Sequence, residues 1–192
     1  MSRLIVIAGP TGAGKTTLAY RLRQEVPALA KALILDEDET RRRLLGYDLR
    51  TEMQDPDYEP DVTARVRKEM DAQARVALSQ GQSVIDCSGF WFPASRAAIH
   101  ALARESGADF IGLWLEVPRA ELEARIDKRQ WERATLSTLS VEQGHASDAD
   151  KAVLDKYADF RPPTLKEGWL LVNGSGKIEI VFHRILSIIS MC

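Results

Sequence analysis

The sequence predicts an α/β fold, a three-layer αβα sandwich around a five-stranded parallel sheet. Five short apolar runs alternate with longer segments whose apolar residues recur at helical spacing. The apolar runs are continuous, which is typical of strands covered by helices on both faces. Alternation of this kind produces a parallel sheet between two layers of helices, with ligands at the carboxyl ends of the strands.

The apolar runs are the predicted strands. The first is followed at once by a glycine-rich turn, and the third ends in an aspartate. The five strands are predicted at residues 4–8, 32–35, 83–85, 110–115 and 169–172.

The segments between the strands carry helix signals. An apolar stripe from Val62 to Ala77 has helical spacing and stops before Gly81, and two helices open with a proline in the first turn. Helices are predicted at residues 17–26, 38–45, 62–77, 93–106, 118–133 and 148–157, with a last one from residue 178. Residues 46–60 are predicted to be a loop facing the ligand, and residues 134–147 a mobile stretch.

Length and composition are those of one globular domain spanning residues 1–192. The net charge of −2 disfavours a dedicated nucleic-acid binder without excluding a nucleic-acid end as substrate. Cys87 and Cys192 are too few for a disulfide framework or a zinc site; Cys87 is expected to be buried and Cys192 to be free. No signal peptide or membrane-length apolar stretch is recognisable, so a cytoplasmic location is expected.

A phosphate-binding loop directly follows the first strand. Residues 9–16, Gly-Pro-Thr-Gly-Ala-Gly-Lys-Thr, match G-x-x-x-x-G-K-[ST]. Glycines let the backbone curl so that several N–H groups point at one phosphate, and the helix that follows adds its positive end. Lys15 should reach the outer phosphates of ATP, and the Thr16 hydroxyl should coordinate Mg²⁺. The predicted nucleotide-binding residues are Gly9, Pro10, Thr11, Gly12, Ala13, Gly14, Lys15, Thr16 and Thr17.

Acidic and basic residues follow the second strand. Phosphoryl transfer to a hydroxyl needs a carboxylate that accepts the hydroxyl proton, and Asp38 is the candidate, with Asp36 behind it. Arg41 is the candidate for fixing the acceptor, whereas Arg42 and Arg43 are expected at the surface. A solvated helix start explains the same pattern, because acids favour the first turn of a helix and bases its end.

The third strand ends in Asp86. This carboxylate is a candidate for holding the metal through water or for contacting the substrate, and the alternative is that it caps the next turn. Three aromatic residues follow, Phe90, Trp91 and Phe92, which could wall an acceptor pocket or belong to the core.

Arg125 and Arg129 lie four residues apart on a predicted helix and therefore share a face. Cations on a segment that closes over the phosphates can neutralise transition-state charge, so residues 125–150 are a candidate lid. An ordinary solvated face with Glu–Arg pairs is the alternative, and spacing alone favours it. His145 lies in the mobile stretch, where it could contact a ligand, but it is not a candidate for catalysis.

Taken together, these elements resemble the small P-loop kinases of the predicted-kinase or AAA_33 type, whose relatives include polynucleotide kinase, gluconate kinase and zeta toxin. The resemblance covers almost the whole chain. It rests on the loop at residues 9–16, Asp38-x-x-Arg41, the strand Gly-Gln-Ser-Val-Ile-Asp86, Arg125-x-x-x-Arg129, and Ala-Ser-Asp-Ala at residues 146–149. Two features depart from it: residues 130–144 are longer than the usual lid, and His145 stands where an aspartate is common.

The resemblance implies a P-loop NTPase fold of the nucleoside- and nucleotide-kinase type. It also implies that Asp38 is the catalytic base, Arg41 a substrate contact, Asp86 a residue of the acceptor side, and Arg125 and Arg129 lid residues. We therefore expect Mg·ATP-dependent phosphorylation of a hydroxyl on a small molecule. A polynucleotide 5′-hydroxyl kinase and a nucleotide-dependent switch or ATPase are the alternatives, and the sequence leaves both the acceptor and the oligomeric state open.

Overall fold

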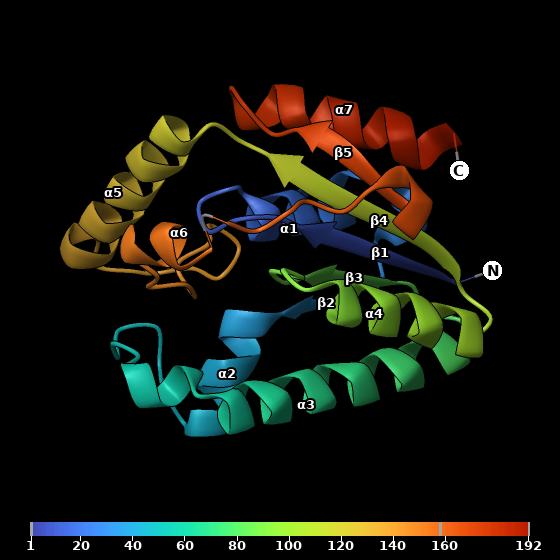
Figure 1. Cartoon of the computed structure of the whole chain (residues 1–192), viewed down its shortest axis with the longest axis horizontal. Coiled ribbons are helices and arrows are strands. Elements are labelled where there is room, and N and C mark those ends of the chain that lie inside the picture. Colours follow the sequence, from blue (N-terminus) through green and yellow to red (C-terminus); the bar gives the residue numbers. More distant parts are fainter. Residues whose placement is uncertain (1, 158, 192) are drawn as a thin grey trace.

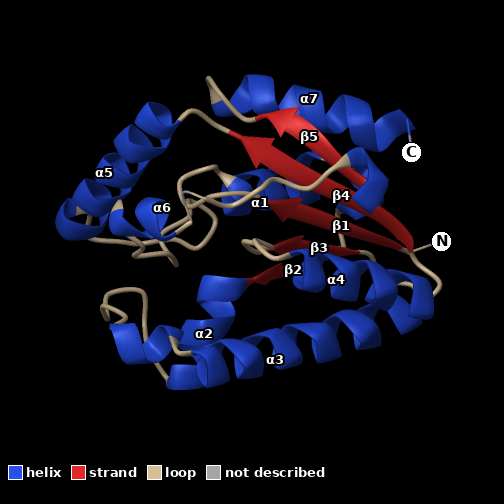
Figure 2. Ribbon diagram, in the orientation of Figure 1, coloured by secondary structure: helices blue, strands red, loops and turns tan. Residues whose placement is uncertain are grey.

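The computed structural model describes residues 2–157 and 159–191, and its centre is a parallel sheet (Figures 1 and 2). The five strands lie in the order β2-β3-β1-β4-β5, and every neighbouring pair is parallel. They are β1 (Arg3–Ala8), β2 (Leu33–Asp36), β3 (Val84–Cys87), β4 (Asp109–Glu116) and β5 (Trp169–Asn173). All five strands lie where the sequence predicts them, within one or two residues, and the predicted fold class is confirmed.

Helices cover both faces of this sheet. One face carries α1 (Lys15–Glu25) and α7 (Ile178–Met191), and the other carries α3 (Pro60–Ser79) and α4 (Pro93–Glu105), as Figure 1 shows. Alternation along β1 supplies both cores, because Ile5 and Ile7 pack toward α1 and α7 whereas Leu4 and Val6 pack toward α3 and α4. The result is the predicted three-layer arrangement.

The remaining elements gather at the carboxyl ends of the strands. There lie α2 (Glu37–Leu45), α5 (Arg119–Thr135) and α6 (Ala152–Lys156), on the side to which the strand arrowheads point in Figure 2. The connecting segment (residues 136–151) joins α5 to α6 through turns and bends. Both chain ends lie at the opposite edge of the molecule (Figure 1).

Two segments differ from the prediction. The helix predicted at residues 148–157 is reduced to α6, because the Asp148 carboxylate is bound to other segments and the Asp150 carboxylate accepts from the N–H of Ala152. The loop predicted at residues 46–60 contains a short 3-10 helix, Asp55–Tyr58. Two further 3-10 turns lie at Pro27–Leu29 and Leu165–Glu167.

Cys87 is buried in the core, as expected, whereas Cys192 lies outside the described residues. Among the helices that the structure describes, none combines the length and the apolar character needed to cross a membrane.

Candidate active site

The phosphate-binding loop connects β1 to α1 and requires glycine at two positions. Gly14 is the N-cap of α1 and has a φ of 91°, in the left-handed region that side chains disfavour. A Cβ on Gly9 would lie 2.9 Å from the carbonyl oxygen of Leu115 on the neighbouring β4. The loop therefore packs tightly against the sheet, and the first N–H groups of α1 have no side-chain cap. Such a helix start favours an anionic ligand.

Lys15 extends back over this loop. Its ammonium donates to the carbonyl oxygens of Gly9 and Pro10, each at 3.0 Å. Burial lowers the pKa of the Lys15 ammonium, while the carboxylates of Asp38 and Asp36 raise it. The lysine is thus placed at the rim of the loop with two carboxylates nearby.

Thr16 and Asp36 form the contact between the loop helix and the second strand. The Thr16 hydroxyl donates to Oδ2 of Asp36 at 2.6 Å, and Oδ1 of Asp36 caps α2 by accepting from the N–H of Glu39. Strand alternation explains this contact, because Asp36 points to the same side of β2 as Ile34, which packs in the core below α1. Burial and then Asp38 raise the pKa of Asp36 to about 7.

Asp86 has different surroundings. It is fully buried, and its carboxylate accepts from Arg67 Nη2 of α3 at 2.8 Å and from the Ser88 hydroxyl at 2.6 Å. Asp86 and Cys87 are adjacent on β3 and therefore point to opposite faces of the sheet; Cys87 faces α1, so Asp86 points toward α3. The carboxylate next to Thr16 is therefore that of Asp36, while Asp86 belongs to a hydrogen-bond network on the other face of the sheet.

Asp38 and Arg41 lie on one side of α2 and both line the main cavity. The Arg41 guanidinium is buried, with Nη2 on Glu37 at 3.0 Å and Nη1 on the backbone oxygen of Asp57 at 2.9 Å. It also lies 4.8 Å from the centre of the Tyr58 ring. Arg41 thus joins α2 to the 3-10 helix Asp55–Tyr58, which lies within the predicted loop.

The prediction that Arg42 lies at the surface is wrong, because its side chain is buried. Its Nε donates to the backbone oxygen of Ala146 at 2.6 Å, and its Nη2 pairs with Asp148 at 2.9 Å. Acids followed by bases on a helix are typical of a solvated face. Here the connecting segment covers the face of α2 that carries Arg42. Arg43 is half exposed, as expected.

Asp148 is a second residue whose contacts are not predicted from the sequence. Besides Arg42, it accepts from the N–H of Met53 at 2.7 Å and from the Tyr58 hydroxyl at 2.8 Å. The carboxylate therefore ties the connecting segment to the loop after α2. Its only signal in the sequence is the string Ala-Ser-Asp-Ala at residues 146–149, which does not identify its partners.

Arg125 and Arg129 of α5 both contact the phosphate loop. Nη1 of Arg125 donates to the carbonyl oxygens of Gly12 and Ala13 at 3.3 Å, and Nη2 of Arg129 donates to the Thr11 hydroxyl at 3.2 Å. Arg129 Nε is buried without a partner among the described residues. The two arginines therefore face the phosphate loop rather than open solvent.

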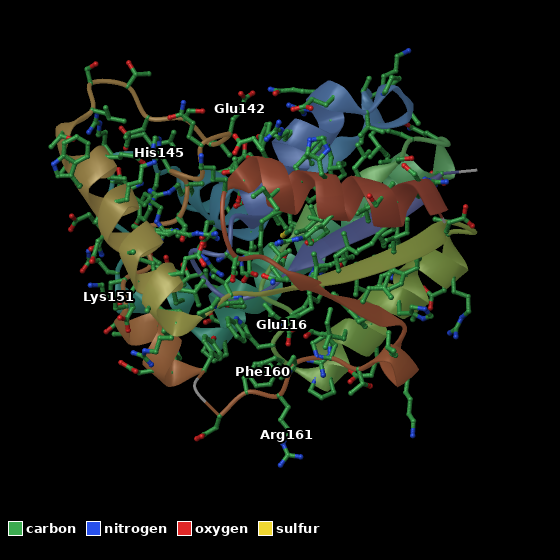
Figure 3. All side chains as sticks on the ribbon, turned by 90° about the horizontal axis from the view of Figure 1, so that it is seen from above. Glu116, Glu142, His145, Lys151, Phe160 and Arg161 are labelled. Atoms are coloured by element: carbon green, nitrogen blue, oxygen red, sulfur yellow. The ribbon has the colours of Figure 1, made fainter. Side chains whose placement is uncertain are left out.

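The connecting segment is held at several points. Nδ1 of the buried His145 accepts from the N–H of Ser140 at 3.0 Å, and its Nε2 lies 3.4 Å from Glu132 of α5. Arg133 donates to the backbone oxygen of His145. Lys151, labelled beside α5 in Figure 3, pairs with Asp127 at 2.7 Å. These contacts hold the connecting segment against α5, and the role of His145 in them is structural.

One cavity of about 870 Å³ joins these features. Its lining includes the phosphate loop with Lys15 and Thr16, the carboxylates of Asp36 and Asp38, and the aromatic residues Trp91 and Tyr157. The Trp91 and Tyr157 rings are stacked, with centroids 4.3 Å apart. Of the three adjacent aromatic residues, only Trp91 lines the cavity, since Phe90 is buried in the core and Phe92 is exposed.

The described residues contain no group of three or more side chains of the His, Cys, Asp and Glu types that could hold a metal by themselves. Magnesium does not need one, since it is commonly bound by one or two protein oxygens together with phosphate oxygens and water. The Thr16 hydroxyl and the Asp36 carboxylate, 2.6 Å apart at the phosphate loop, fit that requirement.

Comparison with known proteins shows the family to which the chain belongs. The AAA_33 family model, described as an AAA domain, matches residues 4–163. An adenylyl-sulfate kinase of Myxococcus xanthus is 29% identical over 140 residues, which cover 71% of this chain and 70% of that protein.

Solved structures show the same fold. The APS kinase of Mycobacterium tuberculosis, solved in complex with AMPPNP and APS, superposes with a TM-score of 0.64 at 16% identity, covering 98% of each chain. A gluconokinase from Sinorhizobium meliloti gives a TM-score of 0.59 at 13% identity, covering 98% of this chain and 92% of the other.

Proposed function

The chain belongs to the AAA_33 family of AAA domains and to the small P-loop kinases, and we propose that it transfers the γ-phosphoryl group of Mg·ATP to a hydroxyl of a small molecule. One observation carries the proposal. A single cavity is lined by the phosphate loop, by Asp38 and by the stacked rings of Trp91 and Tyr157.

The phosphate end would bind the triphosphate. The N–H groups at the start of α1 and the Lys15 ammonium would hold the outer phosphate oxygens. Thr16 and Asp36 would hold Mg²⁺, which would neutralise charge on the phosphates when bound. Arg125 and Arg129 already contact the loop and would stabilise the charge that develops on the transferred group.

Asp38 would act on the acceptor. It lines the cavity beside Lys15, and a carboxylate there can accept the acceptor's hydroxyl proton and direct the oxygen at the γ-phosphorus. Arg41 would keep the acceptor side in place through Glu37 and Asp57, whereas Asp86 would support it through Arg67.

Residues 125–150 would form the lid. The N-terminal half of α5 is anchored in the core by Leu122 and Ile126, so closure would involve the rest of the helix and the connecting segment. A lid in this position would exclude water from the γ-phosphate and limit its hydrolysis.

The test is phosphoryl transfer itself. The protein is incubated with ATP labelled at the γ-phosphate and with a library of hydroxylated metabolites and antibiotics, and each mixture is examined for a labelled organic phosphate. The proposal requires label on an acceptor, in amounts equal to the ADP formed, and none with Lys15→Ala. Label found only as inorganic phosphate would instead indicate an ATPase or switch, and label found only on oligonucleotide 5′ ends would indicate a polynucleotide kinase.

A further inference from the structure

The acceptor end of the cavity contains a carboxylate that the proposed transfer chemistry does not use. Glu37, the first residue of α2, lines the cavity beside Asp38. Its Oε1 accepts from Nη2 of Arg41 at 3.0 Å. The Glu37 side chain is 33% exposed whereas that of Arg41 is 2% exposed, so the carboxylate stands between the guanidinium and the space in front of it.

Most N–H donors of the Arg41 guanidinium are already bound to protein groups and are not available to a ligand. Its Nη1 donates to the Asp57 backbone oxygen at 2.9 Å and to the Thr63 hydroxyl at 3.3 Å, and its Nη2 is on Glu37. Only Nε has no partner among the described residues. Bidentate recognition of a carboxylate, sulfate or phosphate needs two parallel N–H donors. Glu37 occupies one side of that fork, so an anionic acceptor would have to displace it.

The other charges nearby also favour an acceptor without negative charge. Arg67 is paired with Asp71 and Asp86, each at 2.8 Å. Glu37, Asp71 and Asp86 thus pair with the two arginines Arg41 and Arg67, so these three carboxylates outnumber the two guanidinium groups. Lys156 also lines the cavity but is exposed, so solvent screens its charge.

The far wall is aromatic. The stacked rings of Trp91 and Tyr157 line the same cavity as the Thr63 hydroxyl, so apolar and polar groups both reach it. Aromatic faces bind the apolar side of a ring compound, while hydroxyls and carboxylates bind its hydroxyl or amino groups.

We propose that Glu37 determines acceptor specificity, and that the acceptor is a hydroxylated ring compound that carries no anionic group. Glu37 acts by occupying Arg41 and by adding its own negative charge to the acceptor end. This inference rests on the proposed phosphotransfer, and it narrows the acceptor to neutral or amino-bearing compounds.

The experiment uses acceptors in matched sets that differ only in charge. Examples are glucose, glucosamine and glucuronate, or adenosine and AMP, extended to cyclitols and glycosides. ADP release above the acceptor-free rate gives kcat/KM for each member with wild-type protein, Glu37→Gln and Glu39→Gln. Glu39→Gln is the matched control, because it removes the same charge from the same helix, whereas Glu39 does not line the cavity.

We expect the neutral or amino member of the active set to exceed its anionic counterpart by at least about tenfold in wild-type protein, or about 1.4 kcal/mol. Glu37→Gln should reduce that ratio by about the same factor, whereas Glu39→Gln should leave it unchanged. An anionic member preferred by the wild type, or a ratio that responds equally to both variants, overturns the role of Glu37.

The two proposals fail in different ways. An anionic compound that accepts phosphate efficiently refutes the specificity while leaving the kinase activity intact. If no compound accepts phosphate although ATP binds, the phosphotransfer itself is refuted, and the specificity with it. The wild-type preference is measured without any variant, so instability of Glu37→Gln does not remove the test.

Discussion

Arg42 and Asp148, 106 positions apart in the chain, form an ion pair with 2.9 Å between Nη2 and Oδ2, in which Arg42 is buried and Asp148 is largely covered. The pair joins α2, which carries Asp38, to the connecting segment behind α5. Since Asp148 also binds Met53 and Tyr58, one carboxylate brings three separate segments against the cavity.

Removing this carboxylate should destabilise the protein. Asp148→Asn leaves the Arg42 guanidinium buried without its counter-charge, which costs roughly 3 kcal/mol of unfolding free energy in comparable pairs. Asp150→Asn is the control, because Asp150 is exposed and its carboxylate accepts from the nearby N–H of Ala152. Urea unfolding followed by circular dichroism measures both variants, and equal stabilities would show that the ion pair contributes nothing specific.

Lys15→Ala should abolish transfer while leaving the fold intact. The ammonium is the cation closest to the phosphate loop carbonyls, and loss of one such group typically lowers kcat by at least about 100-fold. The assay is the labelled-ATP experiment, with circular dichroism to verify folding and the exposed Lys31→Ala as the control. Full activity of Lys15→Ala would rule out the phosphate loop as the ATP site.

Asp38→Asn should retain ATP affinity and lose transfer. The amide keeps the size of the side chain but cannot accept the hydroxyl proton, and loss of a general base costs about 100- to 10,000-fold in rate. Isothermal titration with a non-hydrolysable ATP analogue and the transfer assay separate the two effects. Transfer near the wild-type rate would exclude Asp38 as the base, and Asp36 or Asp86 would then be tested in its place.

Asp36 predicts a pH dependence of stability in the absence of Mg²⁺ and nucleotide. Burial raises its pKa to about 7, above its ordinary value of 3.8, so the folded protein binds more protons than the unfolded chain between these pH values. The unfolding free energy should therefore fall as pH rises through that window. At about 1.4 kcal/mol per pKa unit, the decrease from Asp36 alone between pH 5 and pH 8 is roughly 3 kcal/mol.

Asp36→Asn removes that titration, so the variant should lose less stability than the wild type between pH 5 and pH 8. The measurement is urea unfolding at a series of pH values with a chelator present. Parallel pH profiles for the two proteins would mean that Asp36 is already ionised at pH 5.

Local sequence patterns are sufficient to predict the strands, most of the helices and the phosphate loop. Strand alternation with helices depends on residues close in sequence, and the motif at residues 9–16 needs only the turn between β1 and α1. The acidic helix start at Asp38 was also readable, since its spacing follows from the end of β2 and the beginning of α2.

The partners of the charged residues were not readable in this way. Arg42 looked like a surface residue because its helix pattern is that of a solvated face, yet the connecting segment covers it. Asp36 and Asp86 both end a strand, and only the direction of the side chain from its strand separates the contact with Thr16 from the contact with Arg67.

The sequence by itself determined the αβα fold and the loop for a nucleotide, because both depend on short-range backbone geometry and on the spacing of a few residues. Only the tertiary structure decided which carboxylate meets Thr16, which arginine is buried, and that Glu37 occupies Arg41 in front of the aromatic wall. These facts depend on the order of the strands and on segments tens of residues apart packing together, which no local pattern encodes.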